Sequence, residues 1–138
     1  MALDIGEKRV GIAISDMREK IASPVSVENA SDVISMTPKF RNLLERWEVE
    51  KLIVGLPKTL SGEEGDQAIR IREIAERIAL KYQLELEYVD ERLSSKEAKN
   101  YMRECGMSEK EMRGKIDMIA AQIFLQTYLD KNTKSEHL

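Results

Sequence analysis

Acidic side chains occupy three places in this sequence where carboxylates could do chemistry. Asp4 falls near the end of a short apolar run, and Asp90 and Glu91 follow a second apolar run. Asp117 shares one face of an expected helix with apolar residues at offsets of three, four and seven. An ionised carboxylate that faces a core costs several kcal/mol unless it is paired or binds a metal. Asp117 therefore requires a partner, and we see no Lys or Arg on its own stripe.

The chemistry that these carboxylates could perform together is metal-assisted hydrolysis. Ala120 and Ala121 are small enough to let the helix lie close to a sheet, so Asp117 could reach the edge that holds Asp4 and Glu91. Three converging carboxylates repel one another unless divalent cations hold them. Oxygen ligands suit Mg²⁺ or Mn²⁺, and two such ions about 4 Å apart form a known clamp for phosphodiester hydrolysis.

Each acidic position also has an ordinary structural interpretation. Asp4 precedes Ile5 and Gly6 and could be a turn aspartate. The Asp90–Glu91 pair could be solvent-exposed, with Glu91 beside Arg92. Asp117 could be partly exposed near the start of its helix. These alternatives stay open at the level of the sequence.

Several other classes of site are excluded by residue counts. The sequence holds a single cysteine, Cys105, which excludes disulfides within the chain, and a single histidine, His137, which excludes multi-histidine metal sites. His137 lies in a polar tail that we expect to be frayed, so Ser-His-Asp and Cys-His catalysis are excluded as well. The segment from Gly55 to Lys58 lacks a nucleotide-binding fingerprint. The loop from Thr59 to Gln67 could present backbone N–H groups to a nucleic-acid backbone or could be an ordinary connection.

Length and composition indicate one globular domain. The chain has 138 residues, of which 42% are hydrophobic and 34% charged. We expect a single domain over residues 1–130 and a polar, frayed tail over 131–138. No apolar run suits a signal peptide or a membrane span, so we expect a cytoplasmic protein.

The pattern of apolar residues predicts alternating strands and helices. Gly11 and Ala13 leave one face of the second strand open for close packing. Strands joined through helices are parallel, so the hairpin should continue into a mixed α/β sheet whose ligands lie at the carboxyl ends of the strands. Strands are expected at 2–5, 9–15, 24–27, 52–54 and 86–89, and helices at 38–47, 66–81, 94–103 and 115–130, with Gly114 interrupting a turn that begins at Ser108.

Five segments of this chain resemble the YqgF family of bacterial ribonuclease H-like proteins. The family is described as Holliday junction resolvases and as nucleases that mature the precursor of 16S ribosomal RNA. The resemblance implies a five-stranded ribonuclease H-like sheet with the first strand central, and an acidic triad at Asp4, Glu91 and Asp117. The segments that carry it are ALDIGEKRVGIAISD (2–16), VGLP (54–57), SGEEGDQA (61–68), VDERLS (89–94) and KIDMIAAQIFLQTYL (115–129).

The resemblance leads to three competing functions. The first is a metal-dependent nuclease for 5′ maturation of pre-16S ribosomal RNA, with Mg²⁺ or Mn²⁺ at the triad and with Lys8, Arg9, Lys58 and Arg92 contacting phosphates. The second is a Holliday junction resolvase, which requires a two-fold dimer rather than a monomer. The third is a non-catalytic nucleic-acid-binding factor. An actin-like ATPase, which shares the Asp-x-Gly hairpin, would need two such domains.

The acidic net charge of the whole chain argues against a nucleic-acid partner, but the charges are unevenly distributed along the sequence. The whole chain carries −3, yet residues 92–115 contain seven Lys or Arg and four Glu. A basic segment therefore lies between two of the expected metal ligands. We expect nucleic-acid binding that is local and sensitive to salt.

Overall fold

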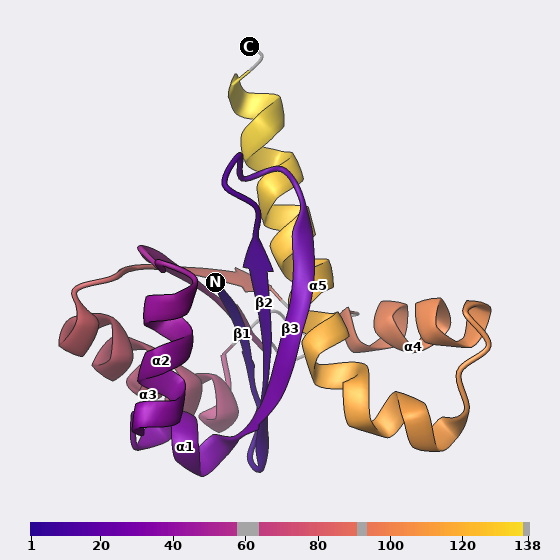
Figure 1. Ribbon diagram of the computed structural model, residues 1–138, viewed down its shortest axis with the longest axis horizontal. Coiled ribbons are helices and arrows are strands. Elements are labelled where there is room, and N and C mark those ends of the chain that lie inside the picture. Colours follow the sequence, from indigo (N-terminus) through magenta and orange to yellow (C-terminus); the bar gives the residue numbers. More distant parts are fainter. Residues whose placement is uncertain (58–63, 91–93, 137–138) are drawn as a thin grey trace.

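The computed structural model describes residues 1–57, 64–90 and 94–136, with the side chains of 94, 95 and 133–136 outside the description. Apart from one short additional helix after the third strand, the strands and helices follow one another in the expected order (Figure 1). The elements are β1 (Ala2–Ile5), β2 (Arg9–Ser15), β3 (Ala22–Asn29), α1 (Ala30–Ile34), α2 (Pro38–Arg46), β4 (Lys51–Leu56), α3 (Asp66–Tyr82), β5 (Glu85–Asp90), α4 (Ser94–Glu104) and α5 (Glu109–Glu136).

The five strands form one mixed sheet in the order β3-β2-β1-β4-β5. β1, β2 and β3 pair antiparallel, whereas β4 pairs parallel to both β1 and β5. This confirms the predicted α/β class, the central place of the first strand and the edge position of the proline-containing third strand. It agrees with the ribonuclease H-like arrangement that the resemblance implied.

The two faces of the sheet carry different helices because side chains alternate along each strand. On one face, Leu3, Ile5, Val10 and Ile12 form a core with residues of α1, α2 and α3. The opposite face is lined by small residues and is covered by α5, which crosses it lengthwise (Figure 1). The α5-facing cluster contains Ala2, Ala13, Ala22, Ile53, Ala121, Phe124, Leu125 and Leu129.

α4 and the first turns of α5 form an arm beside the sheet (Figure 1). Gly106 adopts a positive φ of 78° where the chain leaves α4. Ser108 then caps α5, since its Oγ accepts a hydrogen bond from the Glu111 N–H at 3.2 Å. A separate apolar cluster of Ala98, Met102, Met112, Ile119 and Ala120 holds the two helices together.

The last helix is longer than the sequence predicted. Gly114 lies inside α5 rather than interrupting it, so the helix begins at Glu109 and its backbone continues to Glu136. The sequence predicted that this helix ends near residue 130. Its backbone continues further because no Gly or Pro follows Gly114 to end it. The sequence also missed the short helix α1. None of the helices in the described ranges has both the length and the apolar character that a bilayer crossing demands.

Candidate active site

Gly11 is the residue that brings Asp4 and Asp117 together. Asp4 on β1 is the antiparallel partner of Gly11 on β2. A Cβ added to Gly11 would lie 2.1 Å from both the carbonyl carbon and the carbonyl oxygen of Asp117. The backbone of α5 therefore rests directly on the sheet at Gly11. This confirms the prediction that Gly11 makes room for close packing.

The Asp4 carboxylate is directed toward α5 by its place on the strand. Leu3 and Ile5 belong to the core on the opposite face, whereas Ala2 packs against α5. Alternation along β1 therefore places Asp4 on the α5 face with Ala2. Opposite residues of an antiparallel pair project to the same side of a sheet, so Asp4 and the open face of Gly11 both meet α5.

Asp117 is half-buried and has a cationic partner that comes from another element. Its Oδ2 accepts a hydrogen bond from the Nε of Arg9 at 3.2 Å, and the exposed fractions of the Arg9 and Asp117 side chains are 56% and 26%. The sequence showed no cationic partner on the same helix face as Asp117. The partner, Arg9, is instead the first residue of β2. At this exposure the pair contributes little to stability because solvent screens it.

Asp90 does not join these two residues. Along β5, Val89 packs against the α5-facing cluster, whereas Leu86 and Tyr88 pack against the opposite core. The same alternation places Asp90 on the α3 face. Glu91, the predicted third carboxylate, lies outside the described residues, as do Lys58 and Arg92. The first half of the loop predicted to contact nucleic acid lies outside them as well.

The described residues fit a divalent cation in part. Asp4 and Asp117 supply the hard oxygen donors that Mg²⁺ prefers. Within residues 1–57, 64–90 and 94–136, no group of three Asp, Glu, His or Cys side chains could hold a metal ion. Of the three ligands that the sequence predicts, Asp4 and Asp117 are the two that lie in this part of the chain.

A small hollow, lined by two cationic and two acidic side chains, opens beside Asp117. It has a volume of about 250 Å³ and is formed by Gly6, Glu7, Lys8, Arg9 and Asp117. Two of the predicted phosphate contacts, Lys8 and Arg9, thus lie at the hairpin turn next to a predicted metal ligand. The backbone of this turn is fixed because the Ala30 N–H donates to the Lys8 carbonyl oxygen at 2.9 Å.

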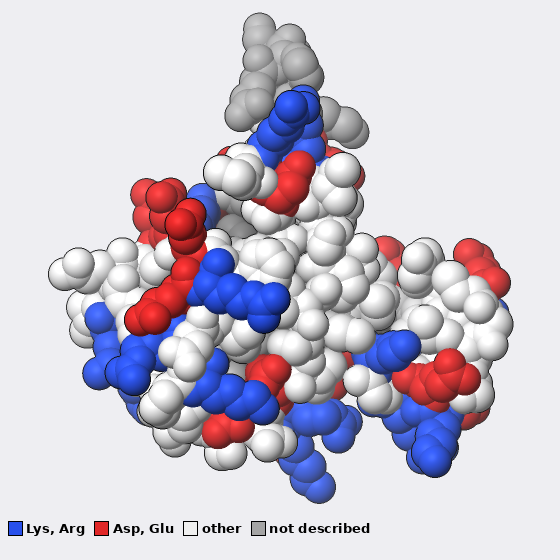
Figure 2. All heavy atoms as spheres, viewed as in Figure 1, with Lys and Arg blue, Asp and Glu red and all other residues white. Residues whose placement is uncertain are grey.

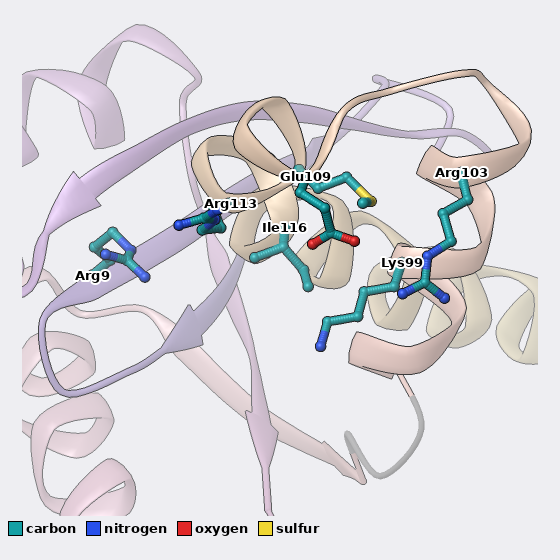
Figure 3. Close-up of a pocket in the computed structure, with 7 residues that line it drawn as sticks. Arg9, Lys99, Arg103, Glu109, Arg113 and Ile116 are labelled. Carbon is teal, nitrogen blue, oxygen red and sulfur yellow. The ribbon is translucent and has the colours of Figure 1, made fainter.

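A larger groove lies next to the hollow, between α4 and α5 (Figure 3). Its volume is about 400 Å³, and Arg9, Lys99, Arg103 and Arg113 line it. The sequence predicted only Arg9 among these four. The excess of Lys and Arg over residues 92–115 indicated that this segment is basic. No spacing pattern in it distinguished Lys99, Arg103 and Arg113 from the other cations.

Comparison with known proteins places this architecture in a family. The profile of the family described as Holliday junction resolvase, RuvX, matches residues 1–131, which is nearly the whole chain. The chain belongs to the RuvX family. Membership in RuvX makes it a nuclease, and this confirms the predicted resemblance over the expected length.

Individual RuvX relatives support the same assignment. Proteins of Chloroflexus aurantiacus and Synechocystis are 37% and 39% identical to this chain over 130 residues, which is 94% of the chain and 85% and 86% of the relatives. A protein of Thermosynechococcus vestitus is 35% identical over 135 residues, or 98% of the chain and 89% of the relative. Each of the three bears the name "Putative pre-16S rRNA nuclease".

Proposed function

We propose that this protein is a cytoplasmic, divalent-metal-dependent nuclease that hydrolyses phosphodiester bonds in structured RNA, with 5′ maturation of pre-16S ribosomal RNA as its reaction. The family and the names of its relatives support a nuclease of ribosomal RNA. The observation that carries the proposal is the packing of Asp117 on Gly11, opposite Asp4. Two acidic residues from elements far apart in sequence thus both adjoin Gly11, toward the carboxyl end of β1, where ligands bind in such folds.

The residues that would hold the metal are Asp4 and Asp117, with Glu91 as the third ligand of the proposal. Bound Mg²⁺ or Mn²⁺, as a pair of ions, supplies positive charge that activates the attacking water and stabilises the leaving oxygen. Asp4 is held in place by strand pairing with Gly11, and Asp117 by the packing of α5 on the sheet. Rigid elements therefore fix both carboxylates before substrate arrives.

The hairpin residues Lys8 and Arg9 would bind the phosphates on either side of the scissile bond. Both are exposed side chains at the edge of the hollow that also contains Asp117. The planar guanidinium of Arg9 suits a phosphate as well as a carboxylate. Arg9 therefore has two competing partners, Asp117 in the free protein and a phosphate in the complex. Lys58 and Arg92 complete the proposed set of phosphate contacts.

The decisive experiment is cleavage by Asp4→Asn compared with the wild type. We expect the substitution to lower Mg²⁺-dependent cleavage of a pre-16S RNA fragment at least about a hundredfold, because it replaces a charged metal ligand by a neutral amide. A chelator should abolish wild-type cleavage, and Mn²⁺ should restore it. Asp32→Asn, on α1 across the sheet, is the matched control and should cleave normally. Cleavage by purified Asp4→Asn at the wild-type rate would refute the assignment.

A second candidate is resolution of four-way DNA junctions, which the family description favours. It would use the same acidic site but needs two symmetric cuts, and therefore a two-fold dimer. Assays on a four-way junction and on the RNA fragment should run in parallel, with sedimentation of the protein alone. A monomer that cleaves only RNA supports the primary proposal. RNA binding without metal binding in calorimetry would instead favour a non-catalytic factor.

A further inference from the structure

Three basic side chains gather in the groove between α4 and α5 without acidic partners. Lys99 and Arg103 extend from α4, and Arg113 from α5 (Figure 3). All three are exposed. None of them forms an ion pair with another residue in the described part of the chain, whereas Arg9, Lys39, Lys51 and Arg72 each do.

The balance of charge in this groove favours an anionic ligand. Four cations line it, and Glu109 is the acidic residue that the lining contains. Like charges held at one site repel one another unless an anion lies between them. A ligand that carries several negative charges in a row would relieve this repulsion at several cations at once.

The floor of the groove indicates which part of a nucleic acid it contacts. Met112 is buried and Ile116 is half-buried, and both side chains are apolar and non-aromatic. The lining contains no aromatic side chain on which a base could stack. Cations around an aliphatic floor suit phosphates and sugars, which carry no sequence information.

The groove is continuous with the candidate active site through one residue. Arg9 lines both the groove and the smaller hollow that contains Asp117, and it pairs with Asp117 itself. A strand lying in the groove would therefore pass Arg9 on its way to Asp117. The basic groove and the acidic site share a single surface around the β1–β2 hairpin.

A hollow at the other end of the sheet is mainly acidic. A hollow of about 790 Å³ beside Trp47 is lined by five acidic residues and one cation. They are Asp16, Glu19, Glu48, Glu50, Glu85 and Lys51. Figure 2 shows a group of acidic side chains at the upper left near the end of α2 and basic side chains beneath the hairpin and the α4–α5 arm. Basic side chains also lie over the left part of this face, and acidic ones on the arm. The mainly acidic hollow is therefore a poorer site for a polyanion than the groove between α4 and α5.

We propose that the α4–α5 groove is a second binding site, in which Lys99, Arg103 and Arg113 hold the sugar–phosphate backbone of one nucleic-acid strand next to the point of cleavage. The statement that the bound strand leads to the point of cleavage rests on the proposed nuclease function. Binding in the groove itself is independent of catalysis. It is expected to be tolerant of base sequence and strongly dependent on salt.

The test measures binding in the absence of cleavage. Fluorescence anisotropy with labelled oligo-U and oligo-A RNA, in a chelator, compares the wild type with a triple variant, Lys99→Gln, Arg103→Gln and Arg113→Gln. We expect the triple variant to bind at least about tenfold more weakly at low salt. The slope of log affinity against log salt should fall by about 2, since each phosphate contact on a single strand contributes about 0.7.

A matched control removes three cations from the other side of the sheet. Arg41 on α2 and Arg77 and Lys81 on α3 are also exposed, and their change to Gln leaves the same net charge as the groove variant. This control should bind within about twofold of the wild type. An equal loss in both triple variants would overturn the proposal, because the loss would then reflect net charge alone.

A gain of affinity provides a test that misfolding cannot imitate. Glu109→Gln removes the negative charge from the groove and should tighten RNA binding about two- to fivefold at low salt. If the groove triple variant proves unfolded by circular dichroism, Glu109→Gln decides the matter: tighter binding supports the site, and unchanged or weaker binding overturns it. A wild type that fails to bind at low salt would also overturn it. A protein that binds through the groove but cleaves nothing would leave the groove established and refute the nuclease.

Discussion

The carbonyl group of Asp117 occupies the space in which any side chain on Gly11 would begin. A Cβ at Gly11 would lie 2.1 Å from the Asp117 carbonyl carbon and oxygen, and 2.6 Å from the next backbone nitrogen. Contacts this short are with backbone atoms, so no rotation of a side chain can relieve them. The absence of a side chain at one position of β2 thus decides where α5 lies and where the Asp117 carboxylate is held.

Gly11→Ala should therefore displace α5 and disable the site together. We expect a loss of about 2–3 kcal/mol in the free energy of unfolding, which is typical of overpacking a well-packed interior. Urea unfolding followed by circular dichroism measures the loss. Metal-dependent cleavage should fall even under conditions where the variant is fully folded, because Asp117 moves away from Asp4.

Gly114→Ala is the control for this prediction. Gly114 lies in α5, the helix that packs on Gly11, but it is exposed, and a Cβ there would meet nothing within 4 Å. The change should stabilise the protein by about 0.5–1 kcal/mol, since alanine favours a helix interior over glycine. Equal stability of Gly11→Ala and the wild type would contradict the close contact between β2 and α5.

Arg9→Gln should tighten the binding of Mg²⁺. The guanidinium of Arg9 pairs with Asp117 at 3.2 Å and competes with a cation for that carboxylate. Both side chains are partly solvated, so the effect is modest: we expect the half-saturating Mg²⁺ concentration to fall about two- to fivefold at constant ionic strength. Titration calorimetry with Mg²⁺ alone measures it without substrate.

Lys8→Gln separates this effect from the loss of a phosphate contact. Lys8 lies beside Arg9 in the same hollow, but the ion pair with Asp117 belongs to Arg9. Both substitutions should weaken RNA binding, whereas only Arg9→Gln should change the affinity for Mg²⁺. An unchanged Mg²⁺ affinity in Arg9→Gln would argue that Asp117 is not a metal ligand.

Glu87→Gln should destabilise the protein at neutral pH and not in acid. Hydrogen bonds from Lys51 and Tyr128 lower the pKa of the Glu87 carboxyl from its ordinary value of 4.5. The Lys51 Nζ and the Tyr128 hydroxyl lie 2.8 and 2.9 Å from Glu87 Oε2. Because the Glu87 side chain is 49% exposed, we expect a loss of only about 0.5–1 kcal/mol at pH 7.

The pH dependence follows from the direction of that shift. A lowered pKa in the folded state means that the unfolded chain takes up the proton first as pH falls. The stabilisation by Glu87 is complete above pH 4.5 and is lost as pH falls through the lower folded value. Urea unfolding at pH 7, 5 and 3 should show the two proteins converging. Glu85→Gln, at another exposed position of the same strand, is the control and should match the wild type at all three pH values.

The order of the elements and most of their boundaries were accessible from local patterns. Thr37 and Pro38 begin α2 as predicted, and the hairpin, the two later strands and the helices between them lie where alternation and helical spacing placed them. The errors have local causes as well. Glycine inside a helix costs only about 1 kcal/mol, so neighbouring helical residues and packing against α4 carry α5 through Gly114.

The sequence by itself determined which residues are able to do the chemistry. Four features can be identified from the sequence without a structure. They are carboxylates at strand ends, the lack of a usable histidine or cysteine, a glycine on β2 and an excess of cations over 92–115. Only the tertiary structure decided which of them meet. Alternation turned Asp90 to the α3 face, and Arg9 became the partner of Asp117 across 108 positions. The α4–α5 hairpin assembled a basic groove, because packing joins residues by direction and distance rather than by their spacing along the chain.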